Sequence, residues 1–136
     1  MRKAVIYTDG SAIPNPGPAG IGALIKDEKG SVVGVVSQYI GSATNNQAEY
    51  EAVIAALEMA LKLQATSVEL RSDSEWLVSQ VNGQYRVKAA AIRPLYIRVK
   101  QLQEQFDVCV FRHIPREQNE AHELADRAVP KAPPPS

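Results

Sequence analysis

Three acidic residues lie where their carboxylates could work together. Asp9 ends a short apolar run and Asp73 ends the run Val68–Ser72, and both runs are of the kind that forms a β-strand. Glu49 lies at the edge of the apolar stripe of an expected helix, where an unpaired carboxylate is costly. If the two strands are adjacent and parallel, both aspartates emerge at one sheet edge, and the helix between them brings Glu49 beside them. Each acid alone also has an ordinary explanation, such as capping a turn or a helix or pairing with a lysine.

Converging carboxylates repel one another and need a cation. Hard divalent ions such as Mg²⁺ prefer oxygen ligands. Two such ions, roughly 3.5–4 Å apart, suit in-line attack of water on a phosphodiester. The three acids therefore predict a metal site that hydrolyses a phosphate ester.

The periodicity of apolar residues predicts the elements that would position these acids. We expect an α/β fold in which three antiparallel strands and two parallel strands form one five-stranded mixed sheet, with helices on its faces. We expect one domain over residues 1–130 and a disordered proline-rich tail at 131–136. The expected strands cover residues 3–8, 21–26, 31–39, 67–72 and 107–111, and the expected helices cover about 45–63, 74–81, 91–105 and 121–129.

The composition is that of an ordinary globular protein. The chain has 136 residues, of which 45% are hydrophobic, and its net charge is zero, so its overall charge does not indicate a nucleic-acid binder. A basic segment, residues 86–100, is typical of a solvated helix face. With one cysteine, Cys109, no bilayer-length apolar run and no signal-peptide pattern, we expect a cytoplasmic protein with no membrane contact.

The chain resembles the type 1 ribonuclease H family in motifs that occur in order over nearly its whole length. The resemblance implies a ribonuclease H fold and Mg²⁺- or Mn²⁺-dependent cleavage of the RNA strand in RNA–DNA hybrids, with two ions. It implies Asp9, Glu49 and Asp73 as catalytic metal ligands. The motifs are Tyr7-Thr8-Asp9-Gly10-Ser11 with Asn15-Pro16-Gly17-Pro18-Ala19-Gly20, then Thr44-Asn45-Asn46-Gln47-Ala48-Glu49, then Ser72-Asp73-Ser74.

The resemblance also implies a substrate groove. It matches Gly10, Asn15, Asn45 and Asn46, with Ser11 and Ser74 beside them, to positions that contact the minor groove of the hybrid. Small amide side chains suit this task, because they both donate to and accept from the 2′-hydroxyl that marks an RNA strand.

The chain departs from the family at the fourth active-site position. The family usually has an aspartate at the start of the last helix, and alignment on the apolar stripe puts His122 there. Asn119, Glu123 and Asp126 are alternatives, and we favour His122 because this alignment leaves the packing undisturbed. His113 resembles a loop histidine that is linked in some members to proton transfer or product release.

The expected activity is an endoribonuclease that hydrolyses the RNA strand of RNA–DNA hybrids and leaves 5′-phosphates. Because the fourth position is altered, a non-catalytic hybrid- or RNA-binding module on the same fold is an alternative function. A third hypothesis is another nuclease of this fold. The family's basic insertion, expected between Gln84 and Leu95, is missing or much reduced, so we expect weak, salt-dependent binding. We expect a monomer.

Overall fold

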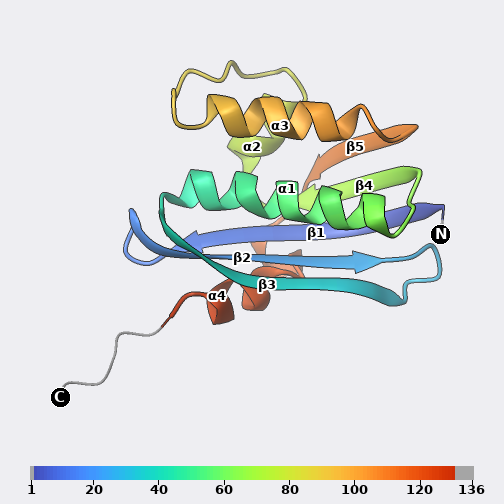
Figure 1. Ribbon diagram of the computed structural model, residues 1–136, viewed down its shortest axis with the longest axis horizontal. Helices are drawn as coiled ribbons and strands as arrows, with labels where there is room; N and C mark the ends of the chain where they lie inside the picture. The colour runs from blue at the N-terminus through green and yellow to red at the C-terminus, as the bar shows by residue number, and fades with distance from the viewer. Residues whose placement is uncertain (1, 131–136) are drawn as a thin grey trace.

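The computed structural model of the chain describes residues 2–130, so the expected tail at 131–136 lies outside the described residues (Figure 1). Its strands form one sheet in the order β3-β2-β1-β4-β5. β2 pairs antiparallel with β1 and β3, whereas β4 pairs parallel with β1 and β5. The predicted mixed sheet is confirmed. The strands are β1 (Lys3–Ala12), β2 (Gly17–Lys26), β3 (Val32–Ala43), β4 (Ser67–Ser72) and β5 (Val108–His113).

The first hairpin is longer than predicted. We expected the first strand to end at Thr8, which is wrong, because its pairing with β2 continues as far as Ala12↔Ala19. The backbone amide of Ile13 donates to the Pro18 carbonyl at 3.0 Å and closes the turn tightly. Gly17, Pro18 and Gly20 therefore lie within β2, although these residue types are typical of turns.

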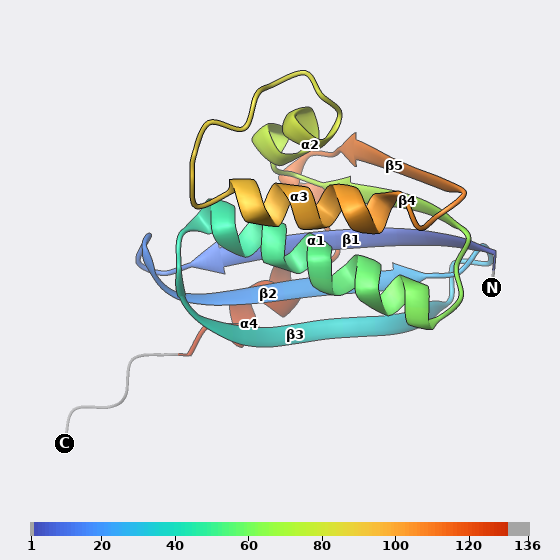
Figure 2. The same ribbon diagram turned by 45° about the horizontal axis from the view of Figure 1, so that its top comes forward.

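Helices cover both faces of the sheet, as predicted (Figures 1 and 2). α1 (Asn45–Lys62) lies across β1 and β2 and packs beside α3 (Arg93–Gln103) on one face. α4 (His122–Ala128) contacts β2, β1 and β3 on the other face. α2 (Glu75–Val81) directly follows β4 and contacts α1, α3 and β5.

α1 is the helix around which the main core forms. Thr44 and Gln47 form a capping box that fixes its first turn. Its predicted apolar stripe is confirmed, since Val53, Leu57 and Ala60 are fully buried in a core shared with the sheet residues Ile6, Ile25 and Leu70. Burial of this stripe is what holds Glu49, one turn before Val53, at a fixed height over the sheet.

A glycine in β2 lets α4 approach the sheet. A Cβ at Gly22 would lie 2.5 Å from the backbone nitrogen of Ala125, which no real side chain tolerates. The absence of that Cβ brings the last helix down onto β2 and β1. The helix also receives a hydrogen bond of 2.7 Å from the Ser37 hydroxyl to the Leu124 carbonyl.

The segment between α2 and α3 has no helix. Residues 82–92 run as turns and irregular backbone, and α3 starts at Arg93, with Pro94 in its first turn, rather than near residue 91. Among residues 2–130, none of the helices has the length and apolar character needed to cross a lipid bilayer.

Candidate active site

The two aspartates meet where the parallel pairing of β1 and β4 stops. The last paired residues are Thr8 of β1 and Ser72 of β4. The residues that follow them in the chain are Asp9 and Asp73, respectively. Beyond this point β4 ends, while β1 continues along β2 with Asp9 opposite Gly22. Asp9 therefore lies inside β1 rather than at its end, which corrects the prediction, yet both carboxylates emerge at the same break in the sheet.

Gly10 brings Glu49 to the aspartates. A Cβ at Gly10 would lie 2.3 Å from the backbone carbon of Ala48, so only glycine allows α1 to cross β1 this closely. The part of α1 that approaches Gly10 is the backbone of Ala48, directly before Glu49. This contact places a helix carboxylate beside two strand carboxylates.

The three carboxylates form a compact, largely buried cluster. One oxygen from each of Asp9, Glu49 and Asp73 lies within 4.8 Å of the others. Asp9 and Glu49 are buried, and Asp73 is half-buried. Burial is the main cause that raises the pKa of Asp9 above its ordinary value, and it raises the pKa of Glu49 much further, with repulsion from Asp9 and Asp73 added.

This donor set fits a hard divalent cation. Glu49 Oε2 is buried without a hydrogen-bond partner among the described residues, which is costly unless something else receives it. Three carboxylates and no thiolate are the ligands that Mg²⁺ and Mn²⁺ prefer. The cluster therefore has the chemistry of a cation site, and one of its buried oxygens has no hydrogen-bond partner among the described residues.

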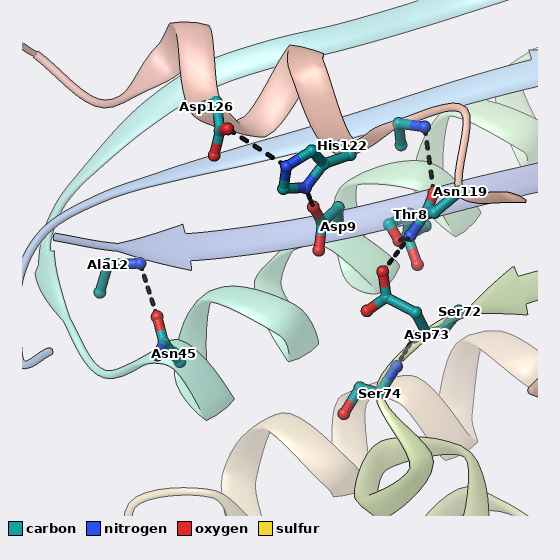
Figure 3. A network of polar contacts seen from close by, with 11 residues as sticks. Thr8, Asp9, Ala12, Asn45, Ser72, Asp73, Ser74, Asn119, His122 and Asp126 are labelled. Carbon is teal, nitrogen blue, oxygen red and sulfur yellow. Dashed lines mark hydrogen bonds and ion pairs between the residues drawn. The ribbon is translucent and has the colours of Figure 1, made fainter. Parts of the chain in front are cut away.

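α4 presents His122 to this cluster (Figure 3). Its Nδ1 lies 2.9 Å from Asp9 Oδ2, and its Nε2 lies 3.3 Å from Asp126 Oδ2, one helical turn further along. His122 is thus the residue of the last helix that contacts the carboxylates directly, whereas Asp126 contacts His122. Glu123, another alternative for the fourth position, pairs with Arg127 at 3.2 Å, and both of these side chains are strongly exposed.

Asn119 is buried beside the same cluster, but its side chain already makes hydrogen bonds to other groups of the protein. Its side-chain amide donates to the Thr8 carbonyl at 2.9 Å and to Asp73 Oδ2 at 3.2 Å. Its side-chain oxygen accepts from the backbone amide of Ala121 at 3.0 Å, directly before α4. Asn119 therefore ties β1, Asp73 and the start of α4 together, which is a bridging role.

A polar cavity of about 280 Å³ opens over the carboxylates. Four of the predicted groove residues line it: Gly10, Ser11, Asn45 and Asn46. A fifth, Ser74, also lines it while its hydroxyl caps α2 by accepting from the Leu77 amide.

The predicted groove asparagines also hold the site together. Asn45 Oδ1 accepts from the Ala12 amide at 2.7 Å, and Asn15 Oδ1 accepts from the Asn45 amide at 3.0 Å. Asn15 does not line the carboxylate cavity. It lies in a neighbouring hollow of about 530 Å³, which Asn45 and Asn46 share. Asn45 and Asn46, at the start of α1, therefore contribute to the lining of both hollows.

Arg116 was not predicted as a site residue from the sequence. Among the described residues that line the cavity, it is the only lysine or arginine. It begins a short 3₁₀ turn, Arg116–Gln118, and makes no ion pair with any described residue. No local sequence pattern marks Arg116 as a cavity residue. His113, expected in a loop, is instead the last residue of β5, exposed and paired in register with Ser72, and it does not line the cavity.

The fold and the carboxylate site agree with a family assignment. Residues 7–128 match the model of a family described as Reverse transcriptase-like. The ribonuclease HI of Halobacterium salinarum is 39% identical over 127 residues, which cover 93% of this chain and 64% of that protein.

Solved structures of ribonucleases H support the same family assignment. The N-terminal RNase H domain of Rv2228c from Mycobacterium tuberculosis, solved as a fusion with maltose-binding protein, is 39% identical with a TM-score of 0.91, covering 94% of this chain and 99% of that one. LC11-RNase H1 in complex with an RNA/DNA hybrid is 45% identical with a TM-score of 0.87, covering 93% and 96%. The chain belongs to the Reverse transcriptase-like family and, within it, to the type 1 ribonucleases H.

The curated relatives are longer than this chain. The matched region is 64% of the Halobacterium protein and 36% of the bifunctional mycobacterial protein Rv2228c. The likeness therefore concerns the ribonuclease H domain.

Proposed function

We propose that this chain is a divalent-metal-dependent endoribonuclease that hydrolyses the RNA strand of RNA–DNA hybrids and leaves 5′-phosphate products. The observation that carries the proposal is the meeting of Asp9, Glu49 and Asp73 within 4.8 Å at the floor of a polar cavity. Support comes from LC11-RNase H1, a 45% identical neighbour that was solved with an RNA/DNA hybrid.

The proposed ligands of two Mg²⁺ or Mn²⁺ ions are Asp9, Glu49, Asp73 and His122. Ions bound there would supply an activated water and charge stabilisation for the leaving 3′-oxygen. The chain's own part is to hold these ligands in place. Gly10 sets the distance between Asp9 and Glu49, and Asn119 fixes Asp73 through its hydrogen bond.

Recognition of the RNA strand falls to the start of α1. Asn45 and Asn46 line the cavity beside Glu49, within reach of a strand whose phosphate lies at the carboxylates. Their amide groups can exchange hydrogen bonds with a 2′-hydroxyl, which a DNA strand lacks. Arg116 also lines the cavity and supplies a positive charge with which a phosphate would pair.

The test is cleavage of a labelled RNA–DNA hybrid with Mg²⁺ and then Mn²⁺. We expect cleavage of the RNA strand alone, with no cleavage of single-stranded RNA. Asp9→Asn should abolish activity while the protein stays folded. Asp107→Asn is the matched control, because this exposed acid lies just before β5, at the end remote from the cavity, and should change nothing.

Two outcomes would overturn the proposal. Cleavage by Asp9→Asn at the wild-type rate would remove the carboxylate site from the mechanism. Retained hybrid binding without cleavage in either metal would make the chain a binding module on a nuclease fold.

Further expectations stay predictions. These are a catalytic domain over residues 1–130, a cytoplasmic location and a monomeric state, of which the last is tested by light scattering after size exclusion. Weak, salt-dependent hybrid binding is another, since the sequence has no long basic insertion between Gln84 and Leu95.

A further inference from the structure

His122 lies between two carboxylates that differ in their access to the cavity (Figure 3). Asp9, on its Nδ1 side, is buried and lines the cavity. Asp126, on its Nε2 side at 3.3 Å, is about half exposed and does not line the cavity. Asp126 therefore reaches the site only through the imidazole ring.

The spacing of the pair is set by the helix. Residues four apart lie on the same side of an α-helix, one turn from each other. α4 is pressed onto β2 by the close approach at Gly22, so both side chains are carried by a fixed element. The geometry of this contact follows from the fold and does not depend on a bound ligand.

The chemistry of a histidine ligand makes this second contact significant. A neutral imidazole carries one N–H, and only its other nitrogen can bind a cation. Asp9, acting alone, would favour a proton on Nδ1, the nitrogen that faces the carboxylates. A carboxylate that accepts from Nε2–H favours the opposite form and leaves the Nδ1 lone pair towards the site.

We propose that Asp126 is a positioning residue that holds His122 in its Nε2–H form, with Nδ1 directed at the carboxylate cluster. The inference rests on the proposed metal-dependent function. His122 and Asp126 then act as one unit in the place where the family pattern has a single aspartate. The fourth position is therefore filled by the pair, and neither His122 nor Asp126 alone describes it fully.

The first test reads the imidazole directly, without metal or substrate. Nitrogen-15 NMR of the full chain in alkaline EDTA buffer separates the two neutral forms, and a His113→Gln variant assigns the signals, since the chain has two histidines. In Asp126→Ala we expect the Nδ1–H form of His122 to increase, because Asp9 is the remaining carboxylate partner. Asp126→Asn keeps an acceptor oxygen and should stay close to wild type. Glu123→Gln, which removes an exposed acid of the same helix, is the control.

The second test is a double-mutant cycle on Mn²⁺ affinity. The affinity is measured by electron paramagnetic resonance and by the metal dependence of cleavage. With His122 present, Asp126→Ala should weaken Mn²⁺ binding about 10-fold, the lower end for such partners because the contact is partly exposed. With His122→Asp, which restores the family's residue, the same Asp126→Ala change should have no effect, within about 2-fold, because no imidazole remains to be held.

The outcomes separate this inference from the proposed function. Equal losses in both backgrounds, or an unchanged imidazole form in Asp126→Ala, would overturn the positioning role even if the wild-type protein cleaves hybrids. A wild-type protein that cleaves no hybrid would overturn the proposed function, while the NMR result would still decide whether Asp126 holds His122.

Discussion

Replacing Glu49 with glutamine should make the metal-free protein more stable. Glu49 is buried, it lies within 4.8 Å of two other carboxylates, and its Oε2 has no hydrogen-bond partner among the described residues. In the absence of a cation, folding therefore brings Glu49 beside two other acids, and its Oε2 gains no hydrogen-bond donor among the described residues. Glu49→Gln keeps the shape of the side chain and removes one of the charges.

The size of the effect follows from two limits. At 4.8 Å, two unit charges repel by about 3.5 kcal/mol at an effective dielectric constant of about 20. Proton uptake caps the cost, because at about pH 7 protonating a carboxyl with an ordinary pKa of 4.5 costs about 3.4 kcal/mol. Burying the glutamine amide costs desolvation free energy, which offsets part of this gain in stability. We expect a net gain of about 1–2 kcal/mol, or roughly 3–8 °C in Tm.

The pH dependence has a definite sign. The folded-state pKa of Glu49 lies well above its unfolded value, so the folded protein binds the extra proton and its stability falls as the pH rises. The penalty is absent below the unfolded value of 4.5 and complete above the raised folded pKa. The stability difference between Glu49→Gln and wild type should be small at about pH 4 and grow towards pH 7.

The assay is urea or thermal unfolding in EDTA over this pH range, repeated with Mg²⁺. Mg²⁺ should stabilise the wild-type protein more than Glu49→Gln, so the difference should shrink. Glu58→Gln, an exposed change on the same helix, should stay within about 0.5 kcal/mol of wild type. If Glu49→Gln were no more stable than wild type near neutral pH, or if its effect did not vary with pH, the electrostatic reasoning would be refuted.

Three further variants test other contacts of the site. Gly10→Ala should destabilise the fold by about 1–3 kcal/mol and lower kcat, since the new Cβ would push the Ala48 backbone away from β1; denaturant unfolding and hybrid cleavage measure both effects. Asn119→Ala should cost about 2–3 kcal/mol in unfolding free energy, because it leaves the Thr8 carbonyl and the Ala121 amide without their partner. Arg116→Ala should raise KM for hybrid cleavage more than it lowers kcat and reduce the salt slope of binding by about 1, as titrations at several salt concentrations would show.

The interiors of the elements were predictable from the sequence, and their ends were not. The stripe of Val53 and Leu57 predicts α1 because burial acts on a local repeat. The extension of β1 to Ala12 depends on pairing with Ala19 across the hairpin, which no local pattern contains. Strand ends are thus set by partners that are distant in the sequence.

The same division holds for the site. The acids were predictable because each ends an apolar run or lies at the edge of a stripe, and their convergence follows from the sheet order. The choice between His122 and Asp126 was not, since both lie on the same side of α4 and only the structure shows that they contact each other. Arg116 was missed because its place depends on how a short turn folds over the cavity.

The cavity draws its walls from β1, α1, the start of α2, the 3₁₀ turn and α4, which together span most of the chain from Asp9 to His122. During synthesis, a ribosome-bound chain that lacks α4 has the carboxylates of the sheet without the residues that close the site. The cavity should therefore be complete only once α4 has been made and has packed onto β2, so that segments far apart in the sequence close the site together.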